Sequence, residues 1–156
     1  MGRYVAALRW LGAQDWFPPI GKRIFPRLDR LVYRLTGGRM VSAGPVLFPT
    51  LLLTTTGHRS GTPSTTPLFY VRDGGSIIVA ATNFGLPAHP VWSQNLLRNP
   101  QATVQIGSES RRYTARLATE SEAARAWPRL VEFWPAYDRY KERSGRDIRV
   151  FVLEPR

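Results

Sequence analysis

The residues best suited to chemistry lie in one stretch, residues 51–68, which reads LLLTTTGHRSGTPSTTPL. An apolar, β-branched run is followed by a turn that carries glycines at Gly57 and Gly61 and cations at His58 and Arg59. Glycines at both ends of a short arc allow several backbone N–H groups to point inward and form an anion-binding nest. Arg59 adds a forked, always-charged donor. The stretch therefore favours a phosphate site, although a cationic turn between two strands is in many proteins only a turn.

Several other kinds of site are excluded or disfavoured. The sequence has no cysteine, so disulfides, thiolate catalysis and zinc–thiolate sites are excluded, and an intracellular, cytoplasmic location is mildly favoured. The two histidines, His58 and His89, have no second ligand at a recognised spacing, so we expect no metal site. No P-loop or Rossmann glycine pattern occurs, and no nucleophile–base–acid constellation is visible.

Two further features suit a planar, phosphate-bearing cofactor that carries the reaction itself. A glycine-containing bend, residues 82–85 (TNFG), follows an apolar run, and an aromatic group occurs at Trp134, Tyr137 and Tyr140. Such parts would give a cofactor position and shielding. The alternative is that these aromatic side chains are ordinary core residues.

The elements that must position these residues are predicted as hairpins with helices between them. We expect strands at 51–56, 65–72, 76–82, 102–107, 111–118 and 148–153, with a tight turn at residues 73–75 (DGG). A helix is expected over 87–97, a second after the capping box of Thr119 and Glu122, and a third after Pro135. This order predicts an α+β domain with a mostly antiparallel sheet or small barrel.

The N-terminal quarter differs in charge from the rest. Residues 1–40 hold eight of the basic residues and two acids, which is +6 of the total net charge of +11. We expect helices at 2–14 and about 26–35, forming an amphipathic basic leader (residues 1–44) before the main domain (residues 45–156). The basic stripe is either a solvated face or a surface that touches a membrane. No recognised nucleic-acid-binding signature accompanies it.

From about residue 45 onward the chain resembles a known family. The runs LLLTTTGHRSGTPSTTPLFYVRDGGSIIVAAT, HPVWSQNLLRNPQATVQIG, ATESEAARAWPRLVEFWPAYDRY and VFVLEP are similar, in order and spacing, to the deazaflavin (F420)-dependent nitroreductase and quinone reductase family of actinobacteria. The resemblance implies a split β-barrel with N-terminal helices, an inserted helix and C-terminal helices. It also implies hydride transfer from reduced coenzyme F420 to a quinone-like or nitroaromatic acceptor, and in some members a location at the membrane periphery.

The resemblance also assigns roles to individual residues. Those implied to bind the cofactor are His58, Arg59, Ser60, Gly61, Pro67, Leu68, Ala80, Thr82, Asn83, Trp92 and Asn95. Those implied to cover the acceptor are Trp134, Tyr137 and Tyr140, with Thr82 or Tyr140 donating a hydrogen bond where negative charge develops. The chain departs from relatives at Ser64 and Asn83, where they commonly carry an arginine and a lysine, and this predicts weaker cofactor binding unless Lys22 or another N-terminal cation substitutes for them.

Two other hypotheses remain open from the residues alone. The same barrel and nest could hold FMN instead of F420. Alternatively, the protein could be a non-catalytic basic module that binds anionic lipid or nucleic acid through residues 1–40. The sequence does not decide the oligomeric state.

Overall fold

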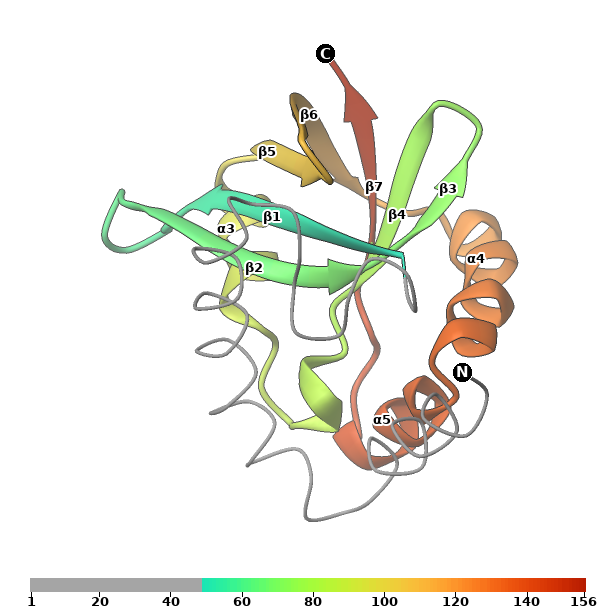
Figure 1. The fold of residues 1–156 in the computed structure, drawn as a ribbon. Coiled ribbons are helices and arrows are strands. Elements are labelled where there is room, and N and C mark those ends of the chain that lie inside the picture. The colour runs from blue at the N-terminus through green and yellow to red at the C-terminus, as the bar shows by residue number, and fades with distance from the viewer. Residues whose placement is uncertain (1–48) are drawn as a thin grey trace.

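The computed structural model describes residues 49–156, which form one seven-stranded sheet. All neighbouring strands are antiparallel, in the order β2-β1-β5-β6-β7-β4-β3. The sheet curls into a half-barrel, so that the edge strand β2 approaches β4 across the open side (Figure 1). The prediction of a mostly antiparallel split barrel in an α+β domain is confirmed. The strands are β1 (Thr50–Thr56), β2 (Pro63–Phe69), β3 (Val71–Asp73), β4 (Ser76–Ala80), β5 (Gln101–Ile106), β6 (Glu109–Leu117) and β7 (Val150–Pro155).

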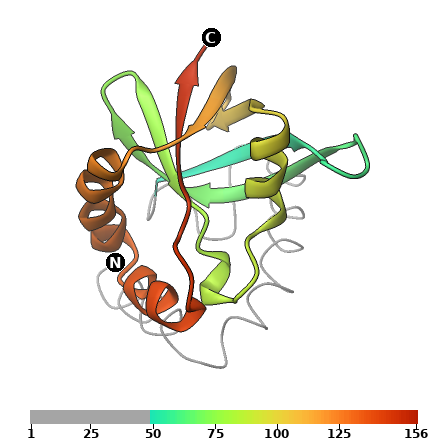
Figure 2. The same cartoon turned by 180° about the vertical axis from the view of Figure 1, so that it is seen from behind.

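The helices of this region are inserted between the strands. They are the short 3-10 helix η1 (Asn83–Gly85), α3 (Val91–Arg98), α4 (Glu120–Phe133) and α5 (Ala136–Ser144). Helix α4 begins with the predicted capping box: the Thr119 hydroxyl accepts from the Glu122 N–H at 3.3 Å, and the Glu122 carboxylate accepts from the Thr119 N–H at 2.8 Å. Figure 2 shows α4 and α5 along one side of the half-barrel and α3 on the other.

Strand β4 is buried on both faces, and this explains its uninterrupted apolar sequence. Side chains of a strand alternate between the two faces of the sheet. Ile77 and Val79 belong to a cluster inside the half-barrel, whereas Ile78 and Ala80 belong to a second cluster beneath α4 and α5. The end of β4 is therefore held from both sides, which makes it a rigid support for the residues that follow.

The structure differs from the sequence prediction at two places. The strand expected over residues 65–72 is interrupted at Tyr70, because β2 pairs with β1 whereas β3 pairs with β4 at the far end of the sheet order. The helix expected over residues 87–97 begins only at Val91, since His89 precedes Pro90 and is therefore disfavoured in the helical region. The tight turn at Gly74–Gly75 is confirmed, with Asp73 paired to Ser76 and Gly74 at φ +59°.

The predicted leader helices at 2–14 and 26–35, and the boundary at residue 44, lie outside the described residues. They remain predictions.

Candidate active site

The predicted ring-binding residues come from the two strands that face each other across the opening of the half-barrel. Pro67 and Phe69 point to the same face of β2, because they are two residues apart. Phe69 packs against Trp134, 5.4 Å between ring centroids, on the face that also carries Ala80. Leu68 instead contacts the cluster inside the half-barrel. A planar ligand at this face would therefore meet the side chain of Pro67 and not that of Leu68.

The aromatic group forms a wall beside this face. Trp134 lies at the end of α4, and Tyr137 and Tyr140 lie on α5. The rings of Tyr137 and Tyr140 are 6.1 Å apart, and Phe84 meets Tyr140 edge-on at 6.2 Å. All three predicted residues are buried among the described residues. They pack as an aromatic layer, in agreement with the core interpretation of these residues, whereas their role as a cover for the acceptor stays a prediction.

Four polar groups in and beside this wall form two hydrogen-bonded pairs. The hydroxyls of Tyr137 and Thr82 are bonded to each other, and the Trp134 indole N–H donates to the Tyr140 hydroxyl at 3.4 Å. Burial raises the pKa of Tyr137 and the pKa of Tyr140 above the ordinary tyrosine value. Both phenols therefore stay protonated at neutral pH. Each can act as a hydrogen-bond donor, as can Thr82, which is 7% exposed.

The bend after β4 is an unusual piece of backbone. Asn83 and Phe84 have φ values of +49° and +56°, and Gly85 follows at +73°. Asparagine tolerates this region better than most residues, and the Asn83 side-chain amide donates to the Ala88 carbonyl at 2.7 Å. The side chain of Asn83 therefore helps to shape the bend.

The loop between β1 and β2, residues 57–62, is shaped by its own hydrogen bonds. The Gly57 N–H donates to the Thr62 carbonyl and the Gly61 N–H to the Gly57 carbonyl, each at 2.8 Å. The His58 N–H donates to Asn95 Oδ1 at 2.9 Å. These three N–H groups are already bonded, two within the loop and one to Asn95 of α3, so they are not available for the anion nest expected from the glycines. Arg59 and Ser60 are exposed on this loop: Arg59 has no ion pair within residues 49–156, and the Ser60 hydroxyl is bonded to the Thr62 hydroxyl at 2.8 Å.

Two residues of α3 that were expected to touch the cofactor are buried and have structural contacts instead. Asn95 is 1% exposed; its Oδ1 also accepts from His58 Nδ1 at 2.7 Å, and its amide donates to the Thr55 hydroxyl at 2.9 Å. Trp92 is 5% exposed and packs against Phe151, 5.6 Å between centroids, inside the half-barrel. Asn95 therefore anchors the cationic loop, and Trp92 anchors α3.

The two parts of the site are widely separated. Pro63 and Pro67 are four residues apart in β2, which corresponds to roughly 13 Å at about 3.3 Å per residue, and Arg59 lies in the loop that precedes Pro63. In Figure 1 the tip of the β1–β2 hairpin lies on the opposite side of the half-barrel from α5. A single ligand that contacts both Arg59 and Thr82 must therefore be elongated, with an anionic group at a distance from a flat one.

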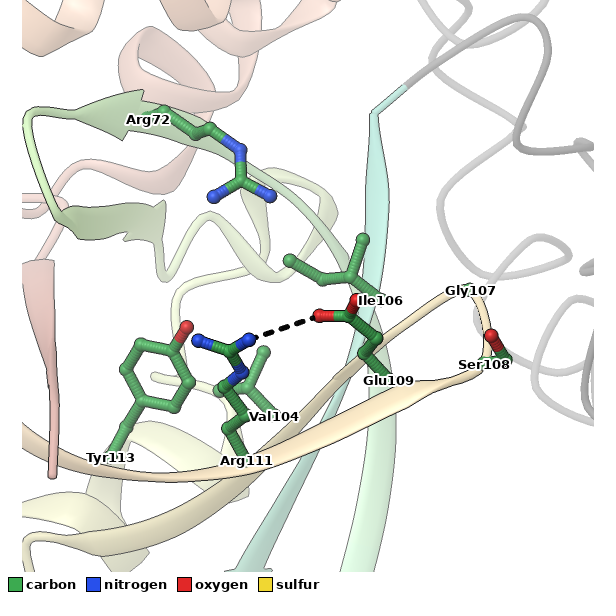
Figure 3. A pocket seen from close by; sticks show the side chains of 8 residues that line it. All are labelled: Arg72, Val104, Ile106, Gly107, Ser108, Glu109, Arg111 and Tyr113. Carbon is green, nitrogen blue, oxygen red and sulfur yellow. Dashed lines mark hydrogen bonds and ion pairs between the residues drawn. The ribbon is translucent and has the colours of Figure 1, made fainter.

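A separate pocket of about 490 Å³ lies at the opposite end of the sheet from Thr82 (Figure 3). None of the predicted site residues lines it. Its lining consists of Arg72, Val104, Ile106, Gly107, Ser108, Glu109, Arg111 and Tyr113, and Arg111 is paired there with Glu109 at 3.4 Å. Within residues 49–156 no three histidine, aspartate or glutamate side chains gather in a way that could hold a metal ion.

Comparison with solved structures defines the class of protein first. An F420-H2 dependent reductase (FDR-A) matches with a TM-score of 0.62 and 36% identity, covering 68% of this chain and 94% of that one. A structure described as a domain-swapped dimer matches with a TM-score of 0.65 and 33% identity, covering 80% and 95%. The half-barrel described above is thus the split-barrel fold of F420H2-dependent reductases.

The sequence comparisons narrow this class to a family. The family model described as F420H(2)-dependent quinone reductase matches residues 25–155. The F420H(2)-dependent quinone reductase Rv1261c of Mycobacterium tuberculosis is 36% identical over 133 residues, which covers 83% of this chain and 89% of the relative. This chain belongs to the F420H(2)-dependent quinone reductase family, a family of oxidoreductases whose coenzyme is F420.

Sequence reasoning missed three residues of this region. Phe69 could have been found, because it alternates with Pro67 on a strand. Phe84 is next to Asn83 but gave no periodic signal. Arg146, whose guanidinium donates to the Ala81 and Thr82 carbonyls at 3.1 Å each, could not have been found from spacing, since its partners lie more than sixty residues earlier in the chain.

Proposed function

We propose that this protein transfers a hydride from reduced F420 to a flat quinone-like or nitroaromatic acceptor bound beside β2 and the end of β4. The observation that carries the proposal is the Thr82–Tyr137 hydroxyl pair, because Tyr137 belongs to the apolar, aromatic cluster that also holds Ala80 and Trp134. When bound, F420H2 supplies the hydride. The protein supplies position, exclusion of water and a hydrogen-bond donor.

The donor set fits the two chemical parts of this coenzyme. The phosphate needs a fixed cation and hydroxyls, which Arg59 and Ser60 offer on a loop anchored by Asn95. The deazaflavin ring needs a flat apolar surface, which the half-buried face of β2 around Pro67 offers. The separation of these parts requires a cofactor in which a chain joins the phosphate to the ring.

The hydroxyls have a specific task at the reacting centre. Hydride transfer to a quinone or nitro group leaves negative charge on an oxygen, and a donor aimed at that oxygen stabilises the transition state. Thr82 or Tyr140 can fill this role, and since both are neutral donors, the reaction does not require either group to ionise. The buried rings of Tyr137 and Trp134 keep water away from that oxygen, so the hydrogen bond is stronger than it would be in bulk solvent.

The proposal is tested by titrating the purified full-length protein with F420 while following tryptophan fluorescence, because Trp134 lies in the wall of the site. We expect saturable quenching at micromolar F420, weaker quenching with FMN, and oxidation of F420H2 upon addition of menadione. Arg59→Ala should weaken F420 binding by about tenfold or more, since it removes a charge-assisted bond worth roughly 1.5–3 kcal/mol. Arg98→Ala, an exposed arginine at the end of α3, is the matched control. Absence of binding to F420 would overturn the proposal, and tighter binding of FMN would favour the FMN alternative.

Replacing Thr82 by valine keeps the shape of the side chain and removes the hydroxyl. We expect kcat with menadione to fall about 10–100-fold while the Kd for F420 changes less than about threefold, because the lost bond acts mainly in the transition state. Thr82→Ser should restore most of the rate. Thr65→Val, at an exposed position of β2, is the control for the removal of a threonine hydroxyl. An unchanged kcat in Thr82→Val would assign the donor role to Tyr140.

A peripheral membrane contact through residues 1–40 is part of the proposal and rests on their net charge of +6. Within residues 49–156, no helix has the length and apolarity needed to cross a bilayer. Removal of residues 1–40 should abolish salt-sensitive co-sedimentation with anionic liposomes. If the shortened protein still co-sediments, the contact lies elsewhere.

A further inference from the structure

The side chain of Arg146 donates hydrogen bonds to several backbone carbonyls beside the proposed site. Arg146 follows α5, whose C-terminus is closed by Gly145 in the left-handed region at φ +61°. Its guanidinium donates to the backbone carbonyl oxygens of four residues between 81 and 88, and to that of Asp147, the next residue in the chain. These acceptors are Ala81 and Thr82 (3.1 Å each), Leu86 (3.3 Å), Ala88 (3.4 Å) and Asp147 (3.4 Å).

These bonds join the two ends of the bend. Ala81 and Thr82 precede the residues with positive φ, whereas Leu86 and Ala88 follow them. Asn83 and Phe84 hold conformations that non-glycine residues rarely adopt, and such conformations persist only where surrounding contacts enforce them. The planar fork of Arg146 reaches both ends at once, so it closes the bend that carries the Thr82 hydroxyl.

The side chain of His89 also contacts Arg146, and this contact requires a neutral imidazole. Arg146 Nη1 lies 3.0 Å from His89 Nδ1. Because a guanidinium has only donors, Nδ1 must accept and carry no proton, so the imidazole is neutral. Burial, and then the charges of Arg146 and Arg149, lower the pKa of His89 below its ordinary value. Arg146 and Arg149 are the charged groups of the described residues that act on His89.

We propose that Arg146 is a positioning residue, which fixes the Thr82 hydroxyl for reaction by tying residues 81, 82, 86 and 88 together through their carbonyl oxygens. This inference rests on the proposed function of Thr82, but its structural part, the closure of the bend, stands on the hydrogen bonds alone. Lysine cannot replace this residue, because a compact ammonium on a flexible stem has no planar fork that matches acceptors from two directions.

The test compares Arg146→Lys with Arg125→Lys, which makes the same chemical change at an exposed position of α4. Two readouts are followed: kcat and Kd with F420, and amide hydrogen exchange at Gly85 and Leu86, whose N–H groups bond the Thr82 and Asn83 carbonyls within the bend. In Arg146→Lys we expect exchange at these two amides to rise at least about tenfold, with the amides of β1 and β5 unchanged. We expect kcat to fall about 10–100-fold with little change in the Kd for F420. Arg125→Lys should change neither readout.

The possible failures are distinguishable. If wild-type protein neither binds nor oxidises F420H2 but Arg146→Lys still loosens Gly85 and Leu86, the proposed function fails and the closure of the bend holds. If exchange and kcat stay unchanged, or if exchange rises equally over the whole sheet, the positioning role is overturned.

A second measurement serves if Arg146→Lys does not fold. Protonation of His89 would place a cation against Arg146, so wild-type kcat should fall at acid pH; because the pKa of His89 is lowered, this fall should lie below the pH at which an ordinary histidine titrates. The variant His89→Gln keeps a neutral acceptor and should lose this acid limb. An acid limb that persists in His89→Gln would count against the arrangement.

Discussion

Replacing Gly85 by alanine is expected to destabilise the protein by about 2–5 kcal/mol and to remove its reductase activity. Gly85 has φ +73°, and a Cβ added there would lie 2.9 Å from the Tyr140 Cα and 3.1 Å from the Tyr140 carbonyl oxygen. A left-handed conformation costs alanine about 1–2 kcal/mol, and forcing an extra carbon into a packed contact costs about 1–3 kcal/mol. Since both atoms belong to the backbone of α5, relief requires the helix that carries Tyr137 and Tyr140 to move.

Gly74→Ala is the matched control for this prediction. Gly74 also has positive φ, +59°, but a Cβ there would meet no atom within 4 Å. We therefore expect only the conformational cost of about 1–2 kcal/mol, with activity retained. Urea unfolding of the two variants isolates the packing contribution as the difference between them. Equal destabilisation would mean that α5 does not press on the bend as the structure indicates.

Asn95→Ala is expected to be the second most damaging change, with a loss of about 2–4 kcal/mol. The variant removes three hydrogen bonds and leaves the Thr55 hydroxyl, which is 2% exposed, without the Asn95 amide. An unsatisfied buried polar group costs about 1–3 kcal/mol, and the small cavity adds to this. For a chain of this length each kcal/mol lowers Tm by about 2–4 °C, so thermal unfolding should detect the change readily.

The same variant should also release the cationic loop. Because Asn95 holds the backbone and the ring of His58, its loss frees residues 57–62, and we expect F420 affinity to fall even though Asn95 itself lies behind the loop. Gln94→Ala, the exposed neighbour on α3, should leave both Tm and affinity unchanged. If Asn95→Ala lowered Tm but left F420 affinity intact, the loop would not be the phosphate site.

The sequence was informative where the cause of structure is local. The turn at Gly74–Gly75 and the capping box of Thr119 and Glu122 are each determined by a few neighbouring residues, and both were predicted correctly. The interruption at Tyr70 was not predicted. Its cause is a change of pairing partner from β1 to β4, which depends on the whole sheet.

In the candidate site, too, some features could be predicted from the sequence and others could not. The family resemblance brought Pro67, Ala80, Thr82 and the aromatic group into one region. In the structure Ala80 shares a buried cluster with the aromatic group, and Thr82 is hydrogen-bonded to Tyr137. The nest was expected from the glycines, but three of its N–H groups are already bonded, and no rule of spacing reveals this. Arg146 was not predicted, because its guanidinium bonds backbone carbonyls. Every residue has such a carbonyl, so the sequence of the bonded residues gives no signal for this interaction.

The position of β7 has a consequence for folding during synthesis on the ribosome. This strand lies between β4 and β6, although it is the last of the seven to be translated. While residues 150–155 remain inside the ribosomal exit tunnel, β7 is missing from the sheet. One edge of β4 and one edge of β6 then have no neighbouring strand. The sheet can be completed only after release of this segment, so a pause late in translation would prolong exposure of the apolar β4 to other chains and to chaperones.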